Sequence, residues 1–75
     1  MSRLPSLKPR EVIRALERGG FFVHHVKGSH HYLRHPERQG IQLTVARHVR
    51  ELPPGTVRRI IRSAGLTEEE FLELL

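Results

Sequence analysis

The segment "HHYLRHPERQGIQLTV", residues 30–45, decides the fold that the sequence predicts. Its last five residues alternate between apolar and polar side chains, with Ile41, Leu43 and Val45 on one face, which is typical of a half-buried strand. The five residues before them begin with proline and end with glycine and are predicted to form a turn. Because a turn this short joins antiparallel neighbours, residues 30–35 are predicted to be the preceding strand.

The sequence before this segment adds a third strand and a helix. "FFVHHV", residues 21–26, is rich in aromatic and β-branched residues and too short for a helix, so it predicts a strand that residues 27–29 join to the next. Apolar side chains at helical spacing predict a helix over residues 8–18, which Gly19 and Gly20 end. These elements give a helix followed by an antiparallel meander.

The sequence after this segment predicts two more helices. Residues 46–55 are expected to form a loop that ends in a Pro-Pro-Gly break, and residues 56–64 show the apolar spacing of an amphipathic helix. A last short helix begins at Thr67, whose capping box with Glu70 is a helix-start signal, and Phe71, Leu72 and Leu75 are expected to fold it back on the body. The predicted fold is a single α+β domain over residues 1–75, of order α-β-β-β-α with a short extra C-terminal helix. The first two helices are expected to cover one sheet face and to leave the other partly open.

The composition limits the possible functions. The chain of 75 residues has no cysteine, which excludes disulfides, thiol nucleophiles and cysteine-based zinc sites. Its formal net charge is +5, and residues 1–66 hold all thirteen basic side chains against four glutamates. A body this basic is expected to bind a polyanion, nucleic acid first, although a plain arginine-rich surface would look the same. No apolar run reaches the length of a signal peptide or membrane span, so we expect a cytoplasmic protein without membrane contact.

Five of the six histidines lie between residues 24 and 35. A shared metal ion is not expected, because residues four apart in a strand, such as His31 and His35, are separated by roughly 13 Å. Adjacent strand residues such as His24 and His25 are expected to point to opposite faces. We therefore expect neither a metal nor another cofactor.

Proton transfer is the alternative role for an imidazole. RNA carries its own nucleophile, the 2′-OH, so a ribonuclease needs a group that moves a proton and cations that stabilise the charge on the phosphate. Strand alternation puts His30, Tyr32 and Arg34 on the face opposite to Leu33, which is expected to face the helices. From spacing alone, His30 is either a proton-transfer group or a solvated histidine on a basic sheet.

The chain resembles the HicA family of toxin endoribonucleases, the mRNA interferases of HicA–HicB toxin–antitoxin pairs. The resemblance runs from about Lys8 to Phe71, through "LERGGF", "KGSHHYLRH", "IQLTVARH" and "LPPGTVRRIIRSAGLTEEEF" in that order. It implies a double-stranded-RNA-binding-domain-like fold, metal-free cleavage of mRNA and a HicB-type antitoxin that blocks the active face.

The resemblance also assigns roles to residues. The catalytic histidine of the family's Gly-Ser-His motif falls on His30, and a second recurrent histidine falls on His48, although Ala46 stands where the family usually has proline. The remaining candidates are expected to contact RNA, together with His48: Lys27, Gly28, Ser29, Tyr32 and Arg34. Two other readings stay open, which are a non-catalytic RNA-binding module of the same fold and a small protein whose arginine face binds an acidic partner.

Overall fold

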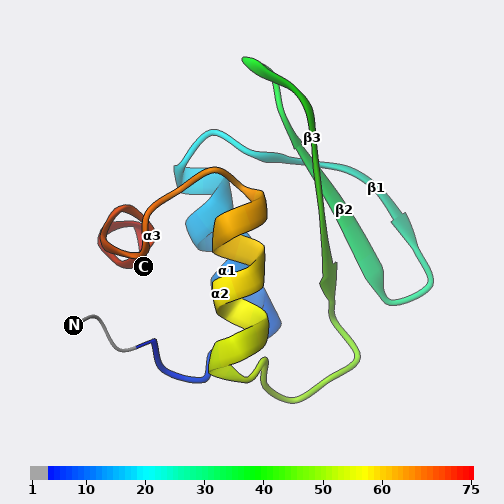
Figure 1. Cartoon of the computed structure of the whole chain (residues 1–75). Coiled ribbons are helices and arrows are strands. Elements are labelled where there is room, and N and C mark those ends of the chain that lie inside the picture. The colour runs from blue at the N-terminus through cyan, green and yellow to red at the C-terminus, as the bar shows by residue number, and fades with distance from the viewer. Residues whose placement is uncertain (1–3) are drawn as a thin grey trace.

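The computed structural model describes residues 4–75, over which the chain forms an α-β-β-β-α-α sequence of elements. The elements are α1 (Pro9–Arg18), β1 (Phe22–Lys27), β2 (His30–His35), β3 (Arg38–Ala46), α2 (Pro54–Ser63) and α3 (Glu68–Leu74), as labelled in Figure 1. The predicted α+β class and the double-stranded-RNA-binding-domain-like order with an extra C-terminal helix are confirmed. No helix within these residues is long and apolar enough to cross a membrane.

The strands form an antiparallel sheet in the order β1-β2-β3. The register pairs Leu33 with Val23 on one side and with Leu43 on the other. Leu33, Leu43 and Val45 are 0–2% exposed, so the alternation in β3 places its apolar face in the core as predicted. The register of β1 shifts between Val23 and His25, which leaves His24 as a bulge.

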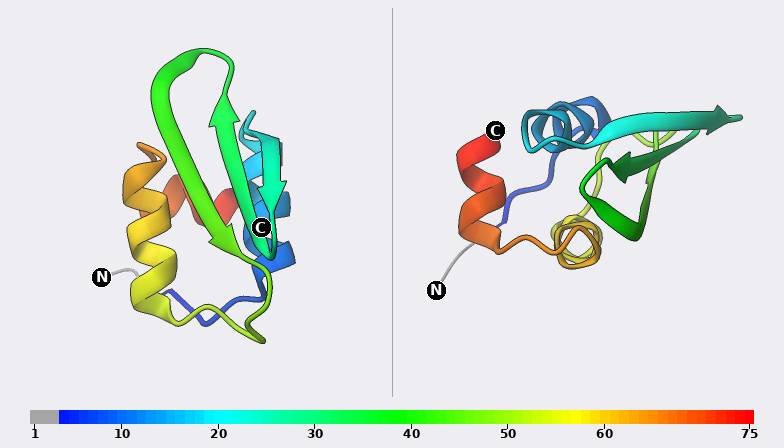
Figure 2. Two further views of the ribbon diagram at one scale, coloured as in Figure 1. Left: turned by 90° about the vertical axis from the view of Figure 1, so that its right-hand side faces the viewer. Right: turned by 90° about the horizontal axis from the view of Figure 1, so that it is seen from above.

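The molecule has three layers, as the two views of Figure 2 show. The helices α1 and α2 lie side by side on one face of the sheet, and α3 packs on their far side. The ring of Phe71 in α3 is fully buried, as are Val12 and Leu16 of α1 and Val57 of α2. The opposite sheet face, here called the outer face, is left open to solvent, which the sequence also predicted.

Several boundaries differ from the prediction. Helix α2 begins at Pro54, because proline is well suited to the first helical position, whereas the sequence reading placed the Pro-Pro-Gly segment in a loop. The turn between β2 and β3 consists of Pro36 and Glu37 alone, since β3 already begins at Arg38. Leu75 is 45% exposed, so the expectation that it packs on the body is wrong.

Helix α3 begins with the predicted capping box. The Glu70 amide donates to the Thr67 hydroxyl at 3.0 Å, and the Thr67 amide donates to the Glu70 carboxylate at 2.8 Å. The hydrogen bond from the Thr67 backbone, followed by that from its side chain, lowers the pKa of Glu70 below its ordinary value of 4.5. The charged carboxylate therefore stabilises the start of α3.

His35 joins β2 to the end of α1. Its Nε2 lies 3.2 Å from the Gly19 carbonyl oxygen, and its Nδ1 accepts the Glu37 amide at 3.1 Å, so the neutral Nε2–H form satisfies both contacts. The ring also meets Phe21 edge-on at 4.9 Å. Gly20, with φ of 97°, lies so close that an added Cβ would be 2.6 Å from His35 Nε2. His35 is thus a structural residue.

Candidate functional site

The open outer face of the sheet carries most of the residues that the sequence singled out. Cross-strand partners share a face, and the register defines three rows on it: Lys27, His30 and Ala46; His25, Tyr32 and Thr44; Phe22, Arg34 and Gln42. His30, Tyr32 and Arg34 therefore lie along one face, as strand alternation predicted. His31 lies on the opposite face, where its Nδ1 is buried without a hydrogen-bond partner among residues 4–75.

The structure brings His30 and His48 together. Their ring centroids are 5.8 Å apart, and the ring planes are inclined by 75°. His30 starts β2 and His48 follows β3, and the two strand ends are adjacent because Ala46 pairs with His30. Ala46 thus occupies the last position of β3, and the chain beyond it returns to the turn that precedes His30.

Two hydrogen bonds hold this returning chain at the Gly28–Ser29 turn. The Arg47 amide donates to the Ser29 carbonyl oxygen at 2.7 Å, and the Ser29 hydroxyl lies 3.0 Å from His48 Nδ1. If Ser29 donates, His48 carries its proton on Nε2; if His48 Nδ1 donates, Nε2 is a free acceptor. In either form the serine fixes the ring and leaves Nε2 for another group.

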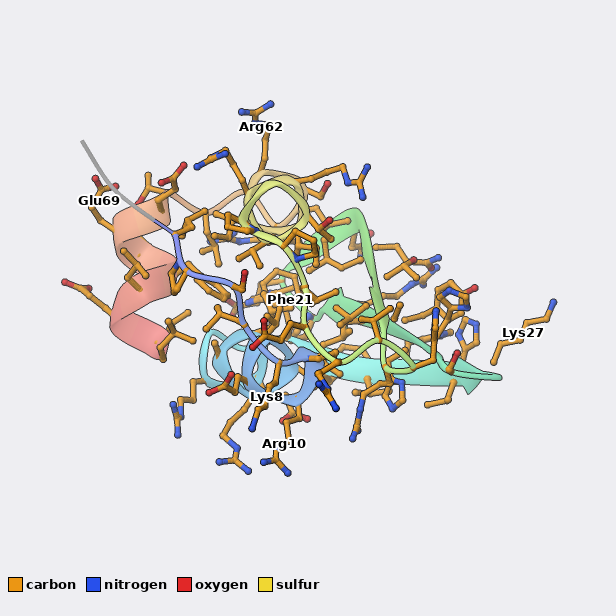
Figure 3. The ribbon with its side chains drawn as sticks, turned by 90° about the horizontal axis from the view of Figure 1, so that it is seen from below. Lys8, Arg10, Phe21, Lys27, Arg62 and Glu69 are labelled. Atoms are coloured by element: carbon orange, nitrogen blue, oxygen red, sulfur yellow. The ribbon has the colours of Figure 1, made fainter. Side chains whose placement is uncertain are left out.

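The Gly28 position is explained by backbone conformation. Gly28 has a φ of 59°, in the left-handed region that favours glycine, and nothing lies within 4 Å of an added Cβ. Lys27 stands next to it at the end of β1, opposite His30. Figure 3 shows the Lys27 side chain reaching outward from the tip of the hairpin, away from the helices.

Tyr32 is stacked on a histidine in the middle of the outer face. The rings of His25 and Tyr32 are nearly parallel, inclined by 11°, with centroids 4.4 Å apart. His24 Nδ1 lies 2.9 Å from His25 Nδ1 and so braces the stacked ring. His25 is not among the residues predicted to contact RNA, and the bulge at His24 turns it onto the same face as Tyr32. Because the rings of His24 and His25 are in contact, the prediction that they point to opposite faces is wrong.

Arg34 lies at the far end of β2 from His30. Its Nε donates to the Gln42 side-chain oxygen at 3.2 Å. Arg34 is four positions along the strand from His30, a span of roughly 13 Å. The two side chains therefore lie on one surface but are too far apart to contact the same phosphate group.

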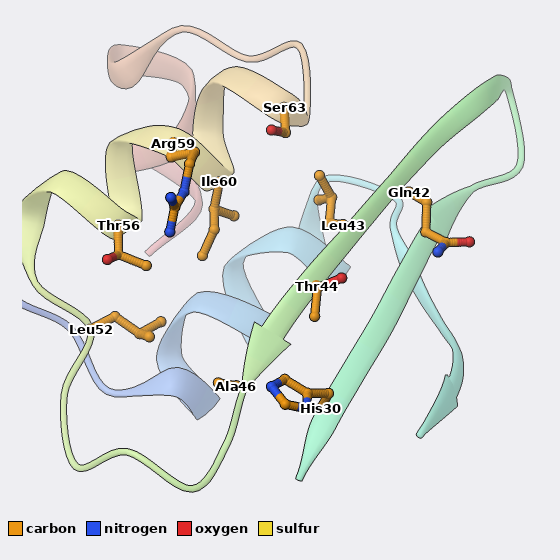
Figure 4. Close-up of a pocket in the computed structure, with 10 residues that line it drawn as sticks. All are labelled: His30, Gln42, Leu43, Thr44, Ala46, Leu52, Thr56, Arg59, Ile60 and Ser63. Atoms are coloured by element: carbon orange, nitrogen blue, oxygen red, sulfur yellow. The ribbon is translucent and has the colours of Figure 1, made fainter. Parts of the chain in front are cut away.

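A groove of about 440 Å³ runs between β3 and α2 and has His30 at one end (Figure 4). It is called the α2–β3 groove below. Its lining residues are His30, Gln42, Leu43, Thr44, Ala46, Leu52, Thr56, Arg59, Ile60 and Ser63. Figure 4 shows Arg59 on the α2 side of this space and His30 on the sheet side. The structure thus adds one cation to the site.

The sequence reading named the arginines of α2 without ranking them. Arg58 forms an ion pair with Glu68 at 3.1 Å, and Arg62 points away from the body in Figure 3, so only Arg59 belongs to the groove. Thr56, Arg59 and Ser63 lie at positions i, i+3 and i+7, which is one face of a helix. The spacing could have shown that the three residues share one helix face, but the sequence alone did not show that this face borders the sheet.

Residues 4–75 contain no group of three or more histidine, cysteine or acidic side chains that is arranged to share a metal ion. The candidate site consists instead of paired imidazoles, a serine, nearby cations and a groove.

The fold and the site together describe a small basic domain with a double-stranded-RNA-binding-domain-like fold and histidines on its open sheet face. Residues 9–66 match the family described as the HicA toxin of bacterial toxin–antitoxin systems, and the chain belongs to this family. The resemblance stated from the sequence is thereby confirmed, and His30, His48 and the α2–β3 groove all lie inside the matched range. A comparison with curated proteins gives no match. As a HicA toxin, the protein is one component of a toxin–antitoxin system, and a cognate antitoxin is implied.

Proposed function

We propose that this toxin is an endoribonuclease that cleaves mRNA without a metal ion, and that a HicB-type antitoxin neutralises it in the cytoplasm. The observation that carries the proposal is the pairing of His30 with His48, 5.8 Å apart, on the open face of a HicA-family domain. Two imidazoles this close can both reach one phosphodiester that lies across them, one at the attacking oxygen and the other at the leaving oxygen.

The reaction needs two proton transfers. One imidazole accepts the proton of the 2′-OH as O2′ forms a bond to phosphorus, and the other donates a proton to the 5′ oxygen as the bond from phosphorus to that oxygen breaks. The products are a 2′,3′-cyclic phosphate and a free 5′-OH, and the two histidines together hold the same number of protons as before. Histidine suits both steps because imidazole changes its charge near neutral pH.

His30 is the catalytic residue of the family motif, and His48 is its partner. The hydrogen bond of 3.0 Å between Ser29 Oγ and His48 Nδ1 supports this role, because a histidine that moves a proton must be held by its other ring nitrogen. Ser29 is accordingly a positioning residue. Gly28 allows the turn that brings Ser29 and His30 to this place.

The cations around the histidine pair would bind the RNA backbone. Lys27 lies opposite His30 across the strands, and Arg59 lines the groove that His30 also lines. Both are suited to the negative charge that builds up on the phosphate. Tyr32 and Arg34 extend the contact surface along β2 and would bind nucleotides that flank the cleaved bond.

The antitoxin would cover this same face. Because the outer face and the groove are basic, the covering segment is expected to be acidic, and its removal would expose His30 and His48 together. This agrees with a toxin whose activity depends on release from its partner.

The experiment that tests the proposed function compares RNA, DNA of the same sequence, and RNA with a single 2′-deoxynucleotide at the cleavage site, each with excess EDTA. We expect cleavage of the RNA alone, with a cyclic phosphate on the product, because only RNA carries the attacking 2′-OH. Cleavage of DNA at a comparable rate would overturn the mechanism. Binding of RNA without any cleavage would instead identify a non-catalytic RNA-binding module.

A further inference from the structure

We infer that the α2–β3 groove receives one unpaired nucleobase of the RNA substrate, next to the phosphate that is cleaved at His30. The inference rests on the proposed function, because it assigns a base-binding subsite to the same site. It adds that the substrate is single-stranded at the cut and that the toxin selects the base there.

The size and position of the groove support a single base as the occupant. Its volume of about 440 Å³ lies within the range of small-molecule pockets, so it holds a base or nucleotide and not a nucleic-acid duplex. His30 is one of its lining residues, so a base in the groove remains connected to a phosphate at the histidine pair. A base inside a duplex is stacked and paired and cannot enter a pocket of this kind without being extruded.

The groove has an apolar floor and a polar rim, which match the flat apolar face and the polar edge of a base. Leu43, Leu52 and Ile60 are buried apolar residues and provide a floor for the flat face of an aromatic ring. The rim carries hydroxyl groups, which can donate and accept hydrogen bonds at the edge of a base. These groups belong to Thr44, Thr56 and Ser63, whereas the side-chain oxygen of Gln42 accepts a hydrogen bond from Arg34.

Arg59 gives the groove its charge and its expected selectivity. None of the lining residues is acidic, and within residues 4–75 the Arg59 side chain has neither an ion-pair nor a hydrogen-bond partner. The neighbouring Arg58 is, by contrast, engaged with Glu68 at 3.1 Å. A guanidinium with free donors pairs best with two adjacent acceptors, which guanine offers as O6 and N7. We therefore expect guanine in the groove.

The test is the sequence preference of cleavage on a randomised RNA pool, measured for wild type, Arg59→Gln and the control Arg62→Gln. Arg62 lies on the same helix and points away from the groove, so its replacement removes the same charge without changing the pocket. We expect wild type to prefer one base at one position beside the cut. Arg59→Gln is expected to lower kcat/KM for the preferred sequence by roughly 5- to 150-fold and to relax that preference.

Arg62→Gln is expected to keep the preference and to lower cleavage of all sequences by a similar small factor. If Arg59→Gln also lowers kcat/KM by the same factor for all sequences, Arg59 contacts the phosphate backbone and the base pocket is refuted. A double-stranded RNA of the preferred sequence that is cut as fast as the single strand would refute it as well.

A binding measurement separates this inference from the proposed function. Chemical shifts of the Thr56 and Ser63 amides are followed by NMR while a 2′-deoxy oligonucleotide of guanine-containing sequence, which the toxin cannot cut, is added. Shifts at these amides support the base pocket even if wild type cleaves no RNA. Shifts confined to the outer face overturn it, as does a groove that responds only to a HicB-type antitoxin.

Discussion

Replacing Ser29 by alanine removes the hydroxyl that lies 3.0 Å from His48 Nδ1 and leaves the backbone bond from Arg47 to residue 29 in place. A neutral hydrogen bond of this kind contributes about 0.5–1.5 kcal/mol, which corresponds to a loss of about 2- to 12-fold in kcat/KM if the bond only orients the ring. Removal of a proton-transfer group costs more, about 10²- to 10⁴-fold, so His48→Ala is expected to be far more severe than Ser29→Ala.

The two variants form a double-mutant cycle. Because Ser29 is argued to act through His48, the Ser29→Ala change should have no further effect on kcat/KM once His48 is alanine. The assay is cleavage of a fluorophore–quencher RNA across a pH series, in which His48→Ala is also expected to remove one limb of a bell-shaped profile. Ser29→Thr keeps a hydroxyl and should restore most of the activity. If Ser29→Ala lowers kcat/KM by the same factor with and without His48, Ser29 contacts the substrate itself and does not act through His48.

The remaining predictions concern stability. Gly20→Ala is expected to lower the free energy of unfolding in urea by at least about 1 kcal/mol, because the position has positive φ and the new Cβ would meet the His35 ring at 2.6 Å; an unchanged midpoint would contradict this. Phe71→Ala should cost about 3–5 kcal/mol, a large share of the roughly 4–11 kcal/mol expected for a domain of this size, and a cost below 1 kcal/mol would show that α3 is not part of the core. Because hydrogen bonds from Thr67 lower the pKa of Glu70, its stabilising effect is complete above pH 4.5 and is lost as the pH falls through the lowered value. Glu70→Gln should therefore lower Tm at neutral pH but not in strong acid. An equal decrease of Tm at every pH would show that the charge of Glu70 is not the cause.

The fold could largely be predicted because each element has a local signal. Alternation in residues 41–45 identified β3 and its buried face, and the capping box located the start of α3. The start of α2 was misplaced because Pro-Pro-Gly is usually a break, whereas here Pro54 occupies the first helical position. The exposure of Leu75 depends on where α3 stops packing against α1, and no local pattern reports that contact.

The candidate site was predictable only where it lies on one strand or in a family motif. Alternation placed His30, Tyr32 and Arg34 on one face, but the position of His48 depends on the loop that the Ser29 carbonyl anchors after β3. The stacking of His25 on Tyr32 depends on a bulge, which changes the sheet face to which the following β1 side chains point. No pattern in the sequence predicts this bulge. The groove requires the packing of α2 against β3, and no local sequence pattern reports how these two consecutive elements are placed against each other.

Catalysis by His30 is tested most directly by RNA cleavage in excess EDTA by wild type, His30→Ala and the control His24→Ala, with RNA affinity measured for each. His24 is an exposed histidine of the same hairpin, and within residues 4–75 its Nδ1 contacts only His25, so its replacement controls for the loss of an imidazole. We expect His30→Ala to bind RNA nearly as well as wild type but not to cut it, and His24→Ala still to cut. Cleavage by His30→Ala at the wild-type rate would show that His30 is not the catalytic residue.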